Sequence, residues 1–443
     1  MKKALICSLI AVAAASVHSA GFGIYEASAR GNAMGGAVVG DTRDATANYH
    51  NPANIGFSTN IQLAAGVTFI NPYCDIEVNH VSQDRMNPGW FTIPTFYATV
   101  PLPFDLALGW GNFTEYGLGS HYSPGWDLAS DTQKTIMRQI TLNPNLAWKA
   151  TDWWSVSAGL RFSWIQFTSH KEPYHGQNLD VDANRMGTLT ATDPFMLRSK
   201  LKGDDWGTGW NAATSVRPID DVSIGLVYRS RIKHKIKGNF DLKGGVHGVA
   251  SGTLNVPGVP YPVATSTTID EKKSAHLPAS AKLRLPQSLT LGVNWDVTKR
   301  YRVGTSLTWT QWSSINNVNF RIPGYGYTLP LRWRDTWRAG IGMEYDLYSW
   351  LSLRCGYAYD EDPSRKSHAS TMLPAGDRHI MGLGAGFRIT DNLRLDIGYN
   401  FIRMNNTHYN IYVKNYSGGT EKYYVSNRNG YSHLASATLT YSF

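Results

Sequence analysis

The chain contains little cysteine and no long apolar stretch beyond its N-terminus. Only 3 of its 443 residues are Cys, and just Cys74 and Cys355 lie beyond the first 20 residues. Their spacing suits no metal site. Because Cys355 lies on the apolar side of an alternating segment, we predict two unpaired structural cysteines in preference to a disulfide. Beyond residue 15, no stretch approaches the roughly 20 apolar residues that a transmembrane helix needs, so we do not expect a helical membrane protein.

Catalytic and metal-binding patterns are also absent. No combination of Ser, His and Asp stands together as a hydrolase would need. The histidines are scattered without metal-ligand spacing, as in His50, His121, His170, His175 and His234. We therefore expect no enzyme, no catalytic residue, no metal and no cofactor.

Acidic residues are fewer than basic ones. The chain carries 42 Lys and Arg against 33 Asp and Glu, a formal net charge of +9. The basic residues are scattered rather than grouped, which argues against nucleic acid as a partner. We interpret the excess as a basic lumen or outer surface that attracts anions.

The N-terminus has the pattern of a secretory signal peptide. Lys2 and Lys3 precede an apolar region, Ala4–Ala15, which is followed by small residues up to Ser19. We predict a signal peptide over residues 1–19, with cleavage after Ala20 as the alternative.

The C-terminal twelve residues, Ser432–Phe443, alternate with a period of two. The sequence SHLASATLTYSF places Ala, Leu, Tyr and Phe on one face and mostly Ser and Thr on the other, and it ends in Phe. One face of such a strand meets lipid and the other a lumen. The 24 Tyr, 15 Trp and 42 Gly, together with a negative mean hydropathy of −0.29, also fit a barrel with aromatic girdles.

Alternating segments recur along the chain, and we predict about 14 of them as strands of an all-β, transmembrane antiparallel barrel. They cover Ile61–Ile70, Phe91–Val100, Phe104–Tyr116, Ile136–Trp148, Trp153–Thr168, Trp206–Arg217, Asp221–Lys235, Leu289–Thr298, Tyr301–Trp312, Arg332–Leu347, Leu351–Asp360, Arg378–Thr390, Leu393–Asn405 and Ser432–Phe443. Short links alternate with long ones, among them Ser169–Asp205 and Ile236–Ser288. Short periplasmic turns and long external loops are typical of an outer-membrane barrel.

Residues 20–60 precede the first strand and show no alternation. They are rich in Gly and Ala, and the turn Asn51–Asn54 lies near their end. Eight strands already give a barrel an interior filled by side chains, so fourteen strands would leave an open lumen. We predict that residues 20–60 form a compact plug, or hatch, inside a barrel of residues 61–443.

Several short motifs together resemble the FadL family of outer-membrane transporters for long-chain fatty acids, which has a second branch for aromatic hydrocarbons. The resemblance covers essentially the whole mature chain. The matching motifs are Ala20-Gly21-Phe22, Asn51-Pro52-Ala53, Tyr116-Gly117-Leu118, Gly209-Trp210-Asn211, Tyr228-Arg229-Ser230, Asp335-Thr336-Trp337-Arg338, Tyr359-Asp360 and Asp377-Arg378-His379.

The resemblance implies passive diffusion of a hydrophobic ligand from a groove between the external loops to a pocket beside the hatch N-terminus, and then to a side exit. On this pattern Phe22 contacts the ligand and Asp360 lies near the pocket. The hatch and gate residues are Gly21, Asn51, Pro52, Tyr116 and Gly117, with an inward kink near Tyr116–Gly119.

Three arginines lie on the Ser/Gly-rich faces of their strands, which predicts that Arg161, Arg229 and Arg338 point into the lumen. One reading pairs them with a fatty-acid carboxylate. The other is an internal network with Asp335, Glu344, Asp360 or Asp396. Late in the fifth strand the resemblance leads us to expect a basic residue, but the sequence has Gln166, beside Trp164, which favours aromatic hydrocarbons.

We therefore predict an outer-membrane channel for passive uptake of hydrophobic compounds, with long-chain fatty acids favoured and toluene-type hydrocarbons as the alternative. A general porin and an outer-membrane enzyme or adhesin are less favoured. The expected partners are the hydrophobic substrate, outer-membrane lipid and lipopolysaccharide, and we expect a monomer.

Overall fold

The computed structural model describes residues 21–87, 89–180, 187–254, 263–323, 325–374, 376–414 and 420–443. The signal peptide and its cleavage site fall outside the described residues and stay predictions. Among the residues described, no helix is both long and apolar enough to cross a membrane.

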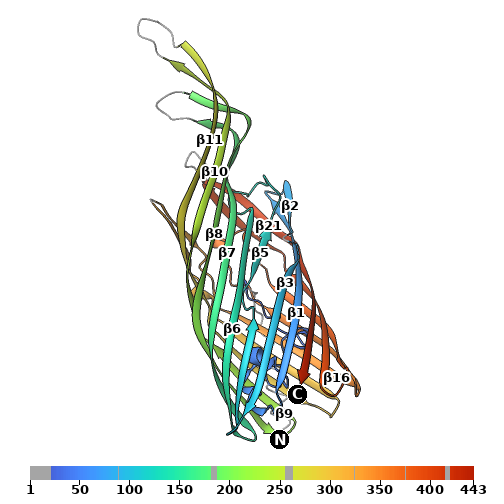
Figure 1. The fold of residues 1–443 in the computed structure, drawn as a ribbon. Helices are drawn as coiled ribbons and strands as arrows, with labels where there is room; N and C mark the ends of the chain where they lie inside the picture. The colour runs from blue at the N-terminus through green and yellow to red at the C-terminus, as the bar shows by residue number, and fades with distance from the viewer. Residues whose placement is uncertain are drawn as a thin grey trace.

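The chain forms a closed antiparallel barrel of fourteen strands (Figure 1). The first segment, β1 (Gln62–Val78), pairs with the last, β21 (Thr420–Ser442), from Gln62–Ser442 to Val78–Val425, and this pairing closes the sheet. The C-terminus lies at the end opposite the long hairpins (Figure 1). The predicted fold class is confirmed.

Several barrel strands consist of two segments separated by a short interruption. The remaining segments are β2 (Ser82–Met86), β3 (Phe91–Leu102), β4 (Leu106–Phe113), β5 (Leu118–His121), β6 (Lys134–Thr151), β7 (Trp154–Asp180), β8 (Gly187–Ile219), β9 (Val222–Arg229), β10 (Ile232–Leu254), β11 (Val263–Leu285), β12 (Ser288–Asp296), β13 (Tyr301–Thr310), β14 (Asn317–Ile322), β15 (Tyr325–Pro330), β16 (Thr336–Tyr348), β17 (Leu351–Asp360), β18 (Arg378–Arg388), β19 (Leu393–Met404) and β20 (Thr407–Lys414). The interrupted strands are β2/β3, β4/β5, β9/β10, β11/β12, β13/β14, β15/β16 and β19/β20.

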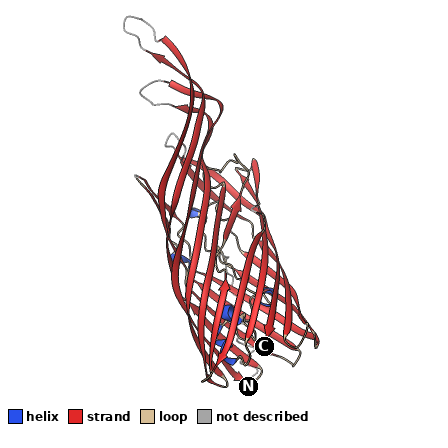
Figure 2. Ribbon diagram, viewed as in Figure 1, coloured by secondary structure: helices blue, strands red, loops and turns tan. Residues whose placement is uncertain are grey.

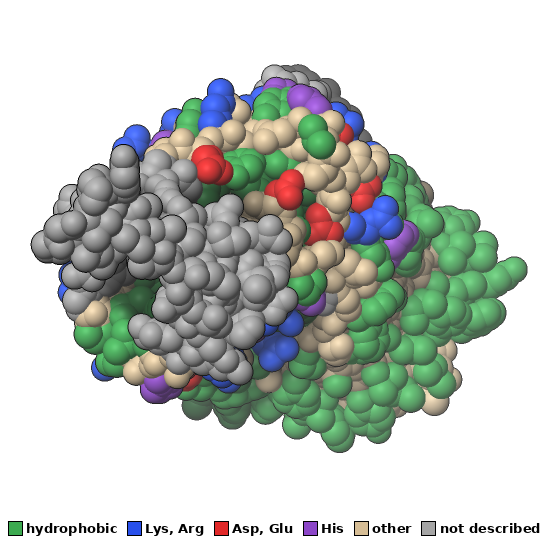
Figure 3. Space-filling model, turned by 90° about the horizontal axis from the view of Figure 1, so that it is seen from above, with side chains coloured by type: hydrophobic (Ala, Val, Ile, Leu, Met, Phe, Trp, Pro, Cys, Tyr) green, Lys and Arg blue, Asp and Glu red, His purple; other side chains and the backbone are tan. Residues whose placement is uncertain are grey.

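The predicted alternation is present in the wall. In β12, Leu289 and Leu291 are exposed on the outer face, whereas Thr290 and Asn294 are buried on the inner face. The outer wall is covered with hydrophobic side chains, and charged side chains gather at the end that faces the viewer (Figure 3). This band is what a barrel needs to lie in lipid.

Two predicted strands are interrupted, so both predictions were wrong in their bounds. The segment Phe104–Tyr116 splits because Phe104 has a positive φ of 65° in the turn and β4 ends at Phe113. The segment Asp221–Lys235 breaks between β9 and β10, at Ser230 and Arg231. The inward-facing positions change from odd to even residue numbers at both interruptions, from Phe113 to Leu118 and from Val227 to Ile232, so one continuous alternation does not describe either segment.

Two predicted long loops are largely strand, so those predictions were wrong as well. The range 169–205 belongs mostly to the β7–β8 hairpin, and the range 236–288 mostly to the β10–β11 hairpin. Both hairpins project far beyond the rest of the barrel (Figure 1). Outside the lipid neither face needs an apolar stripe, so the alternation that predicts a strand is weak there.

The N-terminal segment, residues 21–60, lies within the barrel and carries its short helices (Figure 2). These are α2 (Ala29–Ala33), α3 (Ala47–His50) and the 3₁₀ helix η2 (Pro52–Phe57). Small residues allow close contact with the wall. A Cβ added at Gly304 would lie 2.0 Å from the Ala37 carbonyl oxygen, so only glycine fits there.

Both mature cysteines are free, as predicted. Cys74 is buried near the loop end of the barrel, and Cys355 is exposed on the outer face.

Candidate functional site

The barrel wall is interrupted between β4 and β5. The β3–β4 pairing runs from Leu102–Leu106 to Phe96–Asn112, and β5 then pairs with β6 from Leu118–Met137 to His121–Lys134. The residues between them, Thr114–Gly117, pair instead with the N-terminal segment. Gly23 and Tyr116 form an antiparallel bridge.

Two hydrogen bonds hold this bridge. The Ile24 N–H donates to the Glu115 carbonyl over 2.8 Å, and the Gly117 N–H donates to the Phe22 carbonyl over 2.9 Å. The start of the N-terminal segment therefore satisfies backbone groups that an uninterrupted β-strand would have paired with its neighbours.

A buried carboxylate holds the interruption in place. Glu115 forms an ion pair of 2.5 Å with Arg161 and one of 3.4 Å with Arg229. Its backbone N–H donates to the Gln139 side chain. A buried charge is tolerated when it is paired in this way. These contacts join residues far apart in sequence, which explains why the kink predicted near Tyr116–Gly119 had no local signal.

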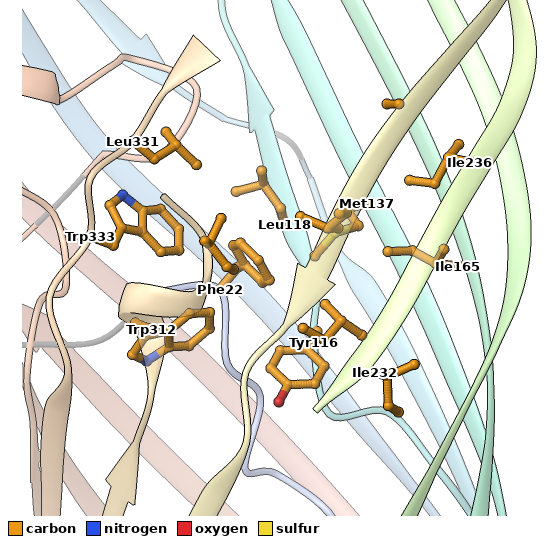
Figure 4. Close-up of a cluster of buried hydrophobic side chains, with 14 residues drawn as sticks. Phe22, Tyr116, Leu118, Met137, Ile165, Ile232, Ile236, Trp312, Leu331 and Trp333 are labelled. Atoms are coloured by element: carbon orange, nitrogen blue, oxygen red, sulfur yellow. The ribbon is translucent and has the colours of Figure 1, made fainter. Parts of the chain in front are cut away.

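Phe22 lies at the centre of a cluster of aromatic and aliphatic side chains (Figure 4). Its ring centroid is 5.0 Å from that of Trp312, 5.3 Å from Trp333 and 5.9 Å from Tyr116. Leu118 and Met137 lie on the other side of the ring (Figure 4). The Phe22 side chain is thus held by apolar contacts and ring packing, whereas its carbonyl accepts the bridge hydrogen bond from Gly117.

A cavity of about 540 Å³ lies beside Phe22 and extends through the interruption in the wall. Its lining includes inward-facing Ile93 and Tyr116, but also Pro94, Ile140 and Trp164, whose side chains lie on the outer face. Such a volume is typical of ligand pockets. The cavity therefore connects the interior of the barrel with its lipid-facing side.

A second, smaller apolar cavity of about 50 Å³ lies on the other side of Phe22. It is lined by residues of the long strands, among them Ile236, Leu283 and Phe320. Phe22, Leu118, Met137 and Leu373 line both spaces and so lie between them.

Two charged side chains line the larger cavity from its inner side, Arg378 and Glu26. Arg378 forms a 2.9 Å ion pair with Asp360 and donates to the Gly23 carbonyl over 3.4 Å, while its buried Nε has no hydrogen-bond partner among the described residues. Burial raises the pKa of Glu26. Sequence reasoning missed both residues, although Arg378 faces Asp360 in the β17–β18 register.

The three predicted arginines point into the lumen, as expected. Arg161 and Arg229 share Glu115, and Arg229 also donates to the Tyr49 carbonyl. Arg338 donates to the Gly35 carbonyl over 3.1 Å and lies over the Tyr25 ring. Their roles toward a substrate stay predictions, but each one already contacts the protein.

The other predicted residues lie in two different places. Trp164 and Gln166 are on the outer face of β7, and Trp164 lines the outer mouth of the cavity. Asn51 caps η2, with Pro52 in its first turn, and donates to the Val39 carbonyl. Gly21 packs against the Trp312 ring. The strand period could have separated outward-facing Gln166 from inward-facing Arg161, because their positions differ by five and residues an odd number apart lie on opposite faces of a strand.

The lower part of the N-terminal segment is held by a buried ion network. Glu344 accepts from Arg30 over 3.0 Å and from Arg302 over 2.8 Å, and it also accepts from Arg354, which lies 2.7 Å from Asp396. This partly bears out the predicted internal network, through Glu344 and Asp396 but with arginines other than those expected.

Comparison with known proteins gives relatives of similar length. The chain is 27% identical over 452 residues to outer membrane protein P1 of Haemophilus influenzae, and the alignment covers 92% of each chain. It is 25% identical over 421 residues to a long-chain fatty acid transport protein of Escherichia coli O6:H1, and this alignment covers 90% of each chain.

Solved structures share the fold. The structure of a Pseudomonas aeruginosa FadL homologue has a TM-score of 0.79 at 20% identity and covers 96% of this chain and 100% of that one. The P. putida toluene transporter TodX has a TM-score of 0.68 at 16% identity, with 95% and 99% covered. Residues 10–443 match the model of the family described as outer membrane protein transport protein (OMPP1/FadL/TodX), and the chain belongs to this family.

Proposed function

We propose that this protein is an outer-membrane channel through which hydrophobic compounds enter by diffusion, long-chain fatty acids first among them. The observation that carries the proposal is the cavity that runs from Phe22 through the interrupted wall to the lipid-facing side. A hydrophobic ligand that leaves by this route passes from protein into the bilayer without crossing water, which removes the largest cost of its transfer.

The path begins at the loop end of the barrel. A ligand that reaches the apolar surface of the long strands passes the smaller cavity, displaces the Phe22 ring and enters the larger one. It then leaves between β3 and β5. Burying an acyl chain is favourable by about 0.8 kcal/mol for each CH₂ group, so release is the difficult step, and a movable N-terminus provides it by changing the pocket.

Residues 20–60 act as the hatch in this proposal, and residues 61–443 are the barrel. The contacts that support the proposal are the ion pair of Arg30 with Glu344 and the hydrogen bonds of Asn51. They hold the lower part of the segment against the wall while Phe22 and Gly23 lie beside the cavity.

A carboxylate ligand has a cation available at the cavity. Arg378 lines this cavity, and guanidinium groups bind carboxylates with charge-assisted hydrogen bonds. The named fatty-acid transporter among the relatives supports the same class. Monoaromatic hydrocarbons are the second candidate, favoured by Trp164 at the outer mouth and by the fold of TodX.

Ligand displacement separates these substrates. Purified protein in detergent is loaded with a fluorescent fatty acid, which is then displaced by oleate, oleyl alcohol or toluene. We expect oleate to compete more strongly than the alcohol. Equal competition by oleate and the alcohol, with strong competition by toluene, would favour the hydrocarbon. No displacement by any of them, combined with passage of sugars, would point to a general porin.

A second variant tests the side exit. A Cβ added at Gly119 would lie 2.0 Å from the Phe91 ring, so Gly119→Phe fills the space between β3 and β5. We expect cells that carry this variant to bind oleate but to lose its uptake. Ala98→Phe adds the same group to the lipid-facing side of β3, where β3 is paired with β4, and should leave uptake unchanged.

A further inference from the structure

The outer face of the barrel carries a group of unpaired cations on β10 and β11. Lys233 and Lys235 of β10 are exposed, and so are Lys282 and Arg284 of β11. We call these four residues the basic patch. They alternate with buried apolar or neutral neighbours such as Ile232, and so they point outward from the wall rather than into the lumen.

Like charges lie directly opposite each other within the patch. The strand register pairs Lys233 with Arg284, and Lys235 with Lys282. Directly opposed residues of an antiparallel sheet have Cβ atoms about 4.5–5.5 Å apart, and like charges at that spacing are destabilising. Two successive repelling pairs on one face are a cost that the fold itself does not need.

The described part of the protein provides no anion to offset this repulsion. No salt bridge reaches any of the four side chains from a described acidic residue. The nearest acidic positions in register are Asp204, which lies opposite Lys237, and Asp205. The carboxylate of Asp205 instead accepts the Lys235 backbone N–H and lies 3.4 Å from His234.

Further cations lie around the patch, with the exposed Asp204 as the acidic position in register with one of them, Lys237. Lys202 is exposed on β8, Lys237 follows Lys235 on the same face of β10, and Arg321 lies in register with Ser280 beyond Lys282. Excess positive charge at this place agrees with the net charge of the chain.

Exposed aromatic side chains lie beside the patch and below it on the same outer surface, with Trp206 level with Lys235. Trp206 is 59% exposed and Trp210 is 50% exposed, and Trp206 is in register with Trp164. Exposed Trp residues at the edge of an apolar band mark the level of the lipid headgroups. The cations therefore lie at the headgroup level, towards the end of the barrel that bears the long hairpins and so faces outward.

We propose that the basic patch binds the phosphorylated sugar headgroup of lipopolysaccharide in the surrounding outer leaflet. This glycolipid carries its phosphates at the headgroup level, beside its acyl chains. The phosphates would lie between the opposed cations and reverse the sign of their interaction, while the acyl chains pack along the wall below. The site is separate from the substrate cavity and rests only on the location of the barrel in the outer membrane.

Lipid titration tests this site. The full-length processed protein is placed in phosphatidylcholine nanodiscs and titrated with bisphosphorylated lipid A or with its dephosphorylated form, and tryptophan fluorescence is followed. We expect the phosphorylated form to bind at least tenfold more tightly. The quadruple variant Lys233→Gln/Lys235→Gln/Lys282→Gln/Arg284→Gln should lose that preference. The double variant Lys299→Gln/Arg300→Gln, at a turn on the opposite end, should keep it.

Thermal unfolding gives an independent readout that does not depend on tight binding. Without lipid A the quadruple variant should unfold at a higher temperature than the native protein, because the repulsion is removed. With lipid A this order should reverse.

Three results would overturn the proposal. One is equal binding of both lipid A forms by the native protein. Another is a quadruple variant that binds phosphorylated lipid A as well as the native protein does. The third is displacement of lipid A by millimolar pyrophosphate or by oleate, which would show a site for soluble anions rather than for a membrane glycolipid.

Discussion

The two ends of the N-terminal segment are held by different forces. Its lower part is joined to the wall by buried polar contacts, such as Arg30 with Glu344 and the Asn400 side chain with the Asn32 carbonyl. Its first residues are held by the Phe22 ring and by one bridge between Gly23 and Tyr116. Polar contacts depend strongly on geometry, whereas apolar contacts tolerate displacement.

This difference assigns separate tasks to the two ends. Release of the lower part would leave buried charges unpaired, which is strongly unfavourable. Release of the first residues exposes apolar surface that a hydrophobic ligand can cover again. A ligand can therefore compensate for displacement of Phe22 but not for displacement of Arg30.

The largest effect is expected at Glu344. Glu344→Gln removes the charge shared by Arg30, Arg302 and Arg354, and Arg354 is fully buried. Breaking a buried ion pair from one side costs about 3–5 kcal/mol. Equilibrium urea unfolding from liposomes should show this loss. Asp346→Asn is the control, because it also contacts Arg302 but is partly exposed, and it should cost less than about 1 kcal/mol. Equal losses in the two variants would contradict the distinction.

The second largest effect is expected at acidic pH, which should weaken the docking of the lower part of the N-terminal segment against the barrel wall. His50 accepts or donates a 2.8 Å hydrogen bond with Ser28, and its burial, followed by the nearby Arg229, lowers the pKa of His50 to about 3. In the released segment the His50 imidazole has its ordinary pKa of about 6.5. As the pH falls below 6.5, the released form therefore binds a proton while the docked form does not, and docking of the segment weakens. Over the two pH units from 6.5 to 4.5 the loss is about 3 kcal/mol.

A spin label reports this release. It is attached through Ser58→Cys in a background without Cys74 and Cys355, and its mobility is followed in urea at pH 7 and at pH 4.5. His50→Gln should remove most of the pH dependence. An unchanged pH dependence in that variant would assign the effect to other groups.

The same contrast explains what the sequence could predict. The strand pattern depends on local alternation, so β12, β17 and the C-terminal strand were predicted at the right places. The interruption at Thr114–Gly117 depends on Glu115 meeting Arg161 and Arg229, which are distant in sequence. No local sequence pattern predicts these ion pairs between residues that are distant in sequence.

The candidate site was predictable to a similar extent. The family resemblance led to Phe22, and strand parity led to the inward arginines. The role of Arg378 follows only from its position beside Gly23 and Asp360. Lys282 and Arg284 of β11 fell in a range that was expected to be loop, so their pairing with Lys233 and Lys235 of the predicted strand Asp221–Lys235 could not be foreseen.

A smaller effect is expected at Arg378, on the ligand side of the movable end. Arg378→Lys keeps the charge but loses the planar fork of donors. We expect the ratio of oleate to oleyl alcohol affinity to fall about tenfold, which corresponds to about 1.4 kcal/mol. Displacement titrations in detergent measure this ratio. Arg403→Lys, on the outer face of β19, is the matched control and should not change it. An unchanged ratio in Arg378→Lys would remove Arg378 from carboxylate binding.

The smallest effect concerns the Phe22 ring, which lines both cavities. Phe22→Leu keeps an apolar side chain but removes ring packing with Trp312, Trp333 and Tyr116, worth about 0.5–1.5 kcal/mol for such pairs. We expect amide hydrogen exchange at Ile24 and Gly117, the donors of the bridge, to rise about fivefold, since 1 kcal/mol of local stability corresponds to that factor.

The matched substitution in the lower part is Phe113→Leu. The Phe113 ring packs against Tyr49 and Tyr97, below the bridge. The Phe113→Leu substitution should raise amide hydrogen exchange in α3 (Ala47–His50) and leave exchange at the bridge amides unchanged. The stability of the barrel in urea should be similar in the two variants. If Phe22→Leu instead raised exchange throughout residues 29–57, the segment would move as one body. Phe22 could then not open the cavity without also breaking the ion pairs of Glu344, and the separation of a movable end from an anchored one would be lost.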